Sequence, residues 1–136
     1  MGREVIASGN YSFAVGIDSI ASGYSSISMG GNAIASGWGS IAMGRNVISS
    51  GDYSFATGLR TIVSNMCNVV IGKYNRATRS GSGTEADPYT YTDAGNYAFI
   101  IGNGTGDETA NRSNALTVDW DGNLWIAGTL KGKIGA

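Results

Sequence analysis

Glycine at every seventh position through the first half of the chain constrains the fold more than any other feature. It occupies positions 9, 16, 23, 30, 37, 44, 51 and 58; position 65 holds Asn, and glycine returns at 72. Between these positions the sequence repeats every fourteen residues, as in IDSIASGYSSISMG (17–30) and GNAIASGWGSIAMG (31–44). Because each glycine weakens a helix by about 1 kcal/mol, the spacing favours short strands joined by turns.

Each seventh residue is expected to lie at a turn with positive φ. Glycine adopts that conformation without steric cost, and Asn tolerates it best among the other residues. Asn65 therefore fits the same expectation.

Apolar residues alternate with small ones between the glycines. One half of each repeat carries isoleucine three residues before its glycine, and the other half carries a second apolar column. The two columns are Ile6, Ile20, Ile34, Ile48 and Ile62, and Phe13, Ile27, Ile41, Phe55 and Val69. Alternation with a period of two over four or five residues indicates strands.

Each fourteen-residue unit is therefore expected to form one rung of a coil, made of strand, turn, strand and turn. Stacked rungs bury a face that a single rung cannot bury. The alternation leaves open which side chains face the interior. We expect the isoleucine column inside, so that Ile34→Asp destroys the fold. Small residues on the other strand would then allow close approach of another chain: Ala14, Ser28, Ala42 and Ala56.

The units SIASGYSSISMG, AIASGWGSIAMG and YSFATG resemble the head repeats of trimeric autotransporter adhesins, the YadA-like head. The resemblance covers five consecutive units in residues 3–72. It implies an all-β fold, a left-handed parallel β-roll of 14-residue repeats, and association as a homotrimer. Charged residues make up only 14% of the chain, against roughly 25% in typical soluble domains, which agrees with a surface covered by other copies.

The chain is expected to divide into four segments, of which residues 1–72 form the repeat roll. Residues 73–94 hold the single proline and a Gly/Ser run, and we expect an inserted loop. GNYAFIIG (95–102) matches GNYSFAVG (9–16), so residues 95–111 are expected to form a resumed rung and a connection. Residues 112–136 place Asp121-Gly122 between alternating apolar runs, which predicts a C-terminal β-hairpin.

The stretch SNALTVDWDGNLWIAG (113–128) resembles segments at the C-terminal ends of bacteriophage tail-fibre and appendage proteins. This resemblance implies the receptor-binding part of a phage tail fibre or appendage, located on the virion, that recognises a host cell-surface ligand, in first place a glycan. The alternative is a head-domain fragment of a bacterial trimeric autotransporter adhesin at the cell surface, binding host or matrix protein. A hydrolytic tail spike and a purely structural spacer are further possibilities.

Two sets of aromatic residues are candidate ligand contacts. The turn after each isoleucine-bearing strand places a ring near one corner, and stacked rings would form a ladder that binds sugars or staples the rungs together. These residues are Tyr11, Tyr24, Trp38 and Tyr53. The segment 73–94, which is either a disordered surface loop or a binding loop, contributes Tyr74, Tyr89 and Tyr91.

The composition argues against several other classes of function. Without histidine, Ser-His-Asp and Cys-His catalysis and imidazole zinc sites are excluded, so we expect no enzyme, no metal and no cofactor. Asp107 and Glu108 are adjacent and are not expected to form a glycosidase pair, and DWDGN (119–123) lacks ligands that a calcium loop needs. A net charge of -1 gives no electrostatic attraction for nucleic acid, and no apolar stretch approaches the roughly 20 residues of a membrane span. The expected partners are copies of the chain and a cell-surface glycan or protein receptor.

Overall fold

A computed structural model of the chain describes residues 2–76 and 97–129. These residues are all β apart from one short 3-10 helix, η1 (Thr109–Asn111). Within the repeats, strands of five residues alternate with strands of two. The five-residue strands are β3 (Phe13–Ile17), β5 (Ile27–Gly31), β7 (Ile41–Arg45), β9 (Phe55–Leu59) and β11 (Val69–Lys73). The two-residue strands are β1 (Gly2–Arg3), β2 (Ile6–Ala7), β4 (Ile20–Ala21), β6 (Ile34–Ala35), β8 (Ile48–Ser49) and β10 (Ile62–Val63).

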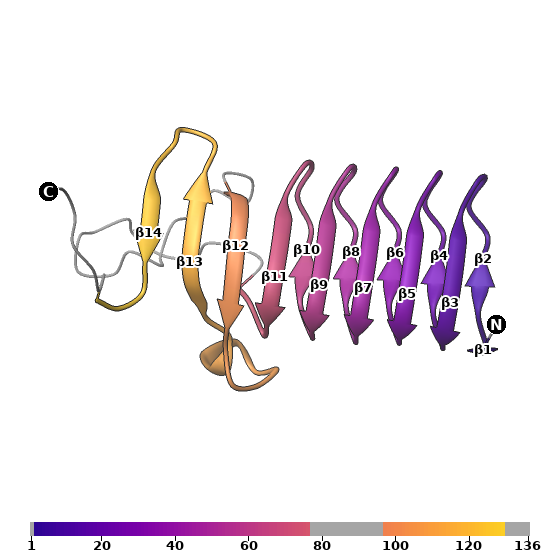
Figure 1. The fold of residues 1–136 in the computed structure, drawn as a ribbon, viewed down its shortest axis with the longest axis horizontal. Coiled ribbons are helices and arrows are strands. Elements are labelled where there is room, and N and C mark those ends of the chain that lie inside the picture. Colours follow the sequence, from indigo (N-terminus) through magenta and orange to yellow (C-terminus); the bar gives the residue numbers. More distant parts are fainter. Residues whose placement is uncertain (1, 77–96, 130–136) are drawn as a thin grey trace, which may run out of the picture.

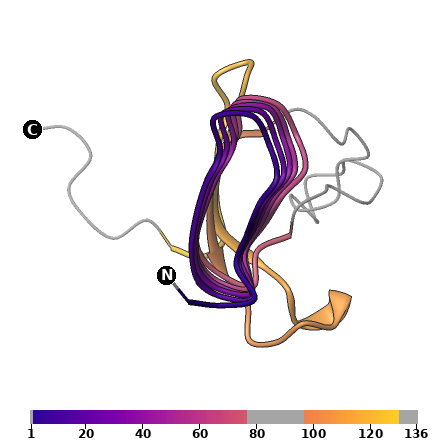
Figure 2. The same ribbon diagram turned by 90° about the vertical axis from the view of Figure 1, so that its right-hand side faces the viewer.

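Successive rungs stack in parallel, with each residue beside its equivalent fourteen positions along the chain. Phe13 pairs with Ile27, and Ile20 pairs with Ile34. The long strands and the two-residue β1 belong to a nine-stranded sheet in the order β1-β3-β5-β7-β9-β11-β12-β13-β14. The other two-residue strands form a five-stranded sheet in the order β10-β8-β6-β4-β2 (Figure 1). Viewed along the stack, the rungs superimpose into one flattened coil with two walls (Figure 2). The predicted parallel β-roll of 14-residue repeats is confirmed.

The repeat glycines fall into two sets with different backbone conformations. Those at the ends of the long strands have φ between 105° and 135°, as expected: Gly16, Gly30, Gly44, Gly58 and Gly72. The alternate set, Gly9, Gly23, Gly37 and Gly51, lacks positive φ, so the expectation is wrong there and for Asn65. In both sets a Cβ would collide with the next rung; it would lie 2.0 Å from the carbonyl oxygen of Gly30 on Gly16, and 2.0 Å from that of Gly37 on Gly23. Asn65 follows β10, the last strand of its sheet, so no further strand of that sheet lies over it.

Non-glycine residues hold the left-handed backbone conformation at both corners of the roll. At the corner after each long strand they are Glu4, Asp18, Asn32, Asn46, Arg60 and Tyr74, with φ from 44° to 54°. At the corner before each long strand they are Tyr11, Ser25, Tyr53 and Cys67, with Gly39 in the same column. None of them is β-branched, which agrees with the particular cost of this conformation for Val, Ile and Thr.

The interior of the roll contains small side chains, so the expectation of a buried isoleucine column is wrong. The fully buried residues include Ala21, Ala35, Ser49 and Val63 from the short strands and Ser28, Ala42, Ala56 and Val70 from the long ones. The two walls are so close that the hydroxyl oxygens of Ser19 and Ser28 hydrogen-bond across the interior at 2.9 Å. No isoleucine fits such a gap, and Ser28, Ala42 and Ala56 therefore cannot provide the surface that a second chain approaches.

The isoleucines lie on the outer face of the five-stranded sheet instead. Ile20, Ile34, Ile48 and Ile62 are partly exposed, and Ile6 is half exposed. The second apolar column faces outward on the nine-stranded sheet, where Phe13 is also half exposed. The roll thus has a small-residue interior and apolar columns on both outer faces.

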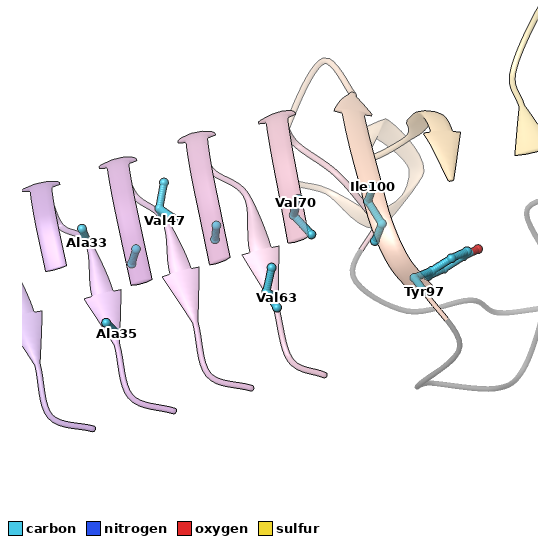
Figure 3. Close-up of a cluster of buried hydrophobic side chains, with 9 residues drawn as sticks. Ala33, Ala35, Val47, Val63, Val70, Tyr97 and Ile100 are labelled. Atoms are coloured by element: carbon cyan, nitrogen blue, oxygen red, sulfur yellow. The ribbon is translucent and has the colours of Figure 1, made fainter. Parts of the chain in front are cut away.

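Buried side chains become larger toward the C-terminal end of the stack. Ala33 and Ala35 give way to Val63 and Val70, and then to Ile100 and Tyr97 (Figure 3). Tyr97 is only 2% exposed, unlike the corner tyrosines of the rungs. A larger core at this end follows from the change in sheet structure beyond β11.

Beyond β11 the nine-stranded sheet continues with three strands, β12 (Tyr97–Asn103), β13 (Asn114–Asp119) and β14 (Leu124–Ile126). β12 pairs in parallel with β11, with Phe99 beside Val69, in the same register as the rungs. β13 and β14 are antiparallel and pair Val118 with Leu124, which confirms the predicted hairpin.

Asp119 holds the turn of this hairpin through its carboxylate. Oδ1 accepts hydrogen bonds from the backbone N–H groups of Asp121 at 3.0 Å and Asn123 at 2.8 Å, and Oδ2 accepts one from the Asn123 side chain at 2.9 Å. Gly122 supplies the positive φ, 84°, that the turn requires. The DWDGN segment is therefore a hairpin turn in which both carboxylate oxygens of Asp119 are already bonded to N–H donors.

Candidate ligand-binding surface

Four aromatic side chains form a continuous row along one corner of the roll, which we call the aromatic ladder. It consists of Tyr11, Tyr24, Trp38 and Tyr53. Neighbouring ring centroids lie 5.4, 5.6 and 5.6 Å apart, with interplanar angles of 78°, 74° and 42°. Tyr11 is 83% exposed and the other three are about half exposed. The four rings predicted to stack are therefore brought together on the surface.

The ladder residues come from two neighbouring positions of the repeat. Tyr11 and Tyr53 occupy the left-handed corner position, whereas Tyr24 and Trp38 lie one position earlier in their rungs. Each of the first four rungs thus supplies one ring from one of the two positions, whereas the fifth has Met66 and Cys67 there. In the third rung Gly39 makes room, since a Cβ on it would lie 3.1 Å from the ring of Tyr53.

Backbone and side-chain hydrogen bonds hold this corner rigidly. The N–H of Tyr53 donates to the carbonyl of Trp38 at 2.7 Å, and the N–H of Gly39 donates to that of Tyr24 at 2.7 Å. The N–H of Trp38 donates to Oδ1 of Asp52 at 2.8 Å. One carboxylate is thus placed beside Trp38, whose ring contacts both Tyr24 and Tyr53. The surface offers exposed rings for stacking and an acidic acceptor at its side.

Of the second set of candidates, the structure describes Tyr74 alone, and it is not brought to the ladder. Tyr74 follows β11 and lies at the other corner, where it has φ 44° and is partly buried. Its carbonyl accepts a hydrogen bond from the N–H of Ser113 at 3.1 Å, so it joins the roll to the C-terminal segment. Tyr89 and Tyr91 lie outside the described residues.

A cluster centred on Arg112 lies near Tyr74 and was not expected from the sequence. Its guanidinium donates to the carbonyl oxygens of Arg60 at 3.0 Å and Asn75 at 3.2 Å, and to Oδ1 of Asp107 at 3.1 Å. Arg60 also forms an ion pair with Asp107. Burial lowers the pKa of Arg112, the positive charge of Arg60 lowers it further, and Tyr74 opposes the shift.

This cluster is a structural clasp rather than a catalytic arrangement. Asp107 is paired with two arginines, so its carboxylate is a bridge between them. The partners of Arg112 lie between 5 and 52 residues away in the sequence, and no local pattern identifies them in advance.

Within residues 2–76 and 97–129, no three His, Cys, Asp or Glu side chains gather as a metal site would require. Among the same residues, no helix has the length and hydropathy needed to cross a membrane.

Comparison with known proteins finds one likeness. The family model of the YadA head domain repeat, which describes two copies of the repeat, matches residues 7–33, 21–46 and 35–61. The matches overlap and advance by one fourteen-residue rung, as the stacking of the strands does. The chain is therefore similar to YadA heads over the part that carries the aromatic ladder. No curated protein and no solved structure matches the chain.

Proposed function

We propose that this chain is an adhesin-type attachment protein whose aromatic ladder binds a glycan on a host-cell surface. The YadA-like repeats suggest an adhesin-type function and an extracellular or cell-surface location. The resemblance of residues 113–128 to tail-fibre segments favours a phage tail fibre or tail appendage as the setting. The observation that carries the proposal is the row of four exposed rings.

The ladder suits an extended sugar chain running along the stack. Its ring separations of 5.4 to 5.6 Å are close to the length of one pyranose unit in an extended polysaccharide, so successive sugars would meet successive rings. Each ring also contacts its neighbour, and such aromatic pairs contribute about 0.5–1.5 kcal/mol to holding the rungs together. The exposure of all four rings leaves surface for a ligand beyond that stapling role.

The proposal includes a homotrimer. Apolar columns on both outer faces would be left in water in a single chain, whereas a closed ring of three copies packs one face of each chain against the other face of the next. Three copies would also present three ladders to one cell surface, and several weak sites acting together raise the overall affinity. Tyr74, Tyr89 and Tyr91 are proposed as a further set of ligand contacts, separate from the ladder.

A glycan array probed with the purified protein tests this function. We expect binding to extended glycans, weakened roughly two- to tenfold by Trp38→Ala if one stacking contact is comparable to an aromatic pair. Trp120→Ala is the matched control, because Trp120 is 55% exposed and lies outside the ladder. Equal binding by the wild type and Trp38→Ala, or no binding to any glycan, would contradict the proposal.

A second function is favoured by the repeats themselves, namely that the chain is the head of a bacterial trimeric adhesin that binds host or matrix protein. The match to the YadA head domain repeat supports it directly. The neighbouring genes distinguish the two settings. Tail and lysis genes support the phage attachment protein, whereas a reading frame that continues into a stalk and an outer-membrane anchor supports the bacterial adhesin.

A further inference from the structure

The outer face of the nine-stranded sheet carries two continuous rows of side chains, which are apolar apart from Thr57. Strand pairing aligns the members of each row from β3 to β14, with no change of face at the hairpin. One row is Phe13, Ile27, Ile41, Phe55, Val69, Phe99, Val118 and Leu124. The other is Val15, Met29, Met43, Thr57, Ile71, Ile101, Leu116 and Ile126. Neither row contains a charged residue.

The two sheets differ in length at the C-terminal end. The five-stranded sheet ends at β10, whereas the nine-stranded sheet continues through β12, β13 and β14 (Figure 1). The inner face of this extension is buried, with Ile100 and Thr117 at most 1% exposed. Its outer face is open, with Leu124 57% and Ile126 36% exposed. The extension therefore presents an apolar surface for which the chain itself supplies no cover among the described residues.

We propose that the outer face of β12–β14 is an assembly surface whose occupant is the same extension of the other two copies in the trimer. This inference rests on the homotrimer proposed above. In the roll, the isoleucine column of one copy and the two rows of the next share the same fourteen-residue rung spacing, so their side chains can interdigitate along the whole stack. A partner with that repeat is another copy of the chain.

Beyond β10 the isoleucine column has no further members. The rows on β12, β13 and β14 therefore cannot meet the five-stranded sheet of a neighbour, although they continue the same surface without a break. The three extensions are left to cover one another. The three β12–β14 extensions close the C-terminal end of the trimer through an apolar contact of their own. The β13–β14 hairpin therefore has a role in assembly rather than in ligand binding.

Thiol accessibility tests the contact in the full chain. In a Cys67→Ser background, Leu124→Cys places a thiol in a row, and Asp121→Cys places one at the exposed turn of the same hairpin. We expect the thiol at position 124 to react with an aromatic disulfide reagent at least about tenfold more slowly than the thiol at 121, because it is buried between copies. Equal rates in a protein of trimeric mass would show that the face is open to a different partner, and would overturn the proposal.

Dilution measurements provide a second test. Replacing Leu124 and Ile126 together by Ser should raise the concentration at which the trimer dissociates at least about tenfold, because their burial between copies is lost. Both side chains are exposed in the single chain, so the hairpin itself should keep its strand signal in circular dichroism. The control replaces Met66 by Ser; Met66 is also exposed but lies outside the rows and the ladder, and dissociation should be unchanged. An unchanged trimer in the Leu124/Ile126 variant would overturn the assembly role and leave the glycan test standing.

Discussion

The side-chain amide of Asn75 hydrogen-bonds both backbone groups of Ile62. Its Oδ1 accepts from the N–H of Ile62 at 2.8 Å, and its Nδ2 donates to the carbonyl at 2.9 Å. Asn114 makes the same pair of contacts with Arg76, at 2.9 and 3.2 Å. The Asn75 side chain thus takes the place of further backbone at the end of the five-stranded sheet, where an unpaired edge would otherwise be left, and Asn114 does the same for Arg76, fourteen residues further along the chain.

Asn75→Ala should lower the free energy of unfolding by about 2 kcal/mol, because it leaves both groups of Ile62 without their partner. Urea unfolding followed by circular dichroism measures the change. Asn10→Ala is the control, since Asn10 is exposed. If the free energy of unfolding falls no more for Asn75→Ala than for Asn10→Ala, the hydrogen bonds of the Asn75 side chain contribute nothing to stability.

Arg112→Lys should lower the free energy of unfolding by about 1 kcal/mol or more, because a lysine cannot reproduce the planar fork that reaches Arg60, Asn75 and Asp107. The exposed Arg45→Lys should change it little. The effect should persist at high salt, since three of the four acceptors are backbone carbonyls, those of Arg60, Asn75 and Asp107, and are not screened as an exposed ion pair is. Identical denaturation curves for both variants would argue against the clasp.

Gly23→Ala and Gly31→Ala should behave in opposite ways. A Cβ on Gly23 would meet the carbonyl oxygen of Gly37 at 2.0 Å, so a destabilisation of about 3 kcal/mol or more is expected. A Cβ on Gly31 meets nothing within 4 Å, and alanine there should stabilise by roughly 0.5–1 kcal/mol through the unfolded state. Thermal unfolding compares the two, and equal shifts in the midpoint would be inconsistent with the rung stacking.

Ile34 and Ala35 are neighbours in β6 with opposite orientations, so their replacement should separate assembly from folding. Ile34→Asp should keep the strand spectrum in the cold and lose the trimer, because Ile34 lies on the outer face. Ala35→Leu should disrupt the roll itself, by about 3 kcal/mol or more, because Ala35 is 0% exposed between two close walls. Circular dichroism and light scattering distinguish the two outcomes. An unfolded Ile34→Asp beside a normal Ala35→Leu would reverse the assignment of the two faces.

The repeat predicted the rungs, their parallel pairing and the hairpin because these depend on spacing along the chain. It did not predict which side chains point inward, because both sets on a strand, Ile34 and Ala35 for example, are compatible with burial. The distance between the two walls decides which side chains face the interior. That distance is seen in the structure, in the hydrogen bond between Ser19 and Ser28 across the interior.

The ladder was predictable because its rings recur at nearly equal spacing, although they come from two repeat positions. The partners of Asn75 and Arg112 were not predictable, since their contacts join residues that are up to 52 positions apart. The left-handed backbone at Tyr11 and Arg60 was also missed, because glycine was expected to occupy the corners.

Static light scattering on the purified protein, over a range of dilutions, tests the central claim that the outward apolar columns gather the chain in threes. We expect a mass three times that of the 14.0 kDa chain. A mass of 14.0 kDa at all concentrations, with the strand spectrum intact, would contradict it.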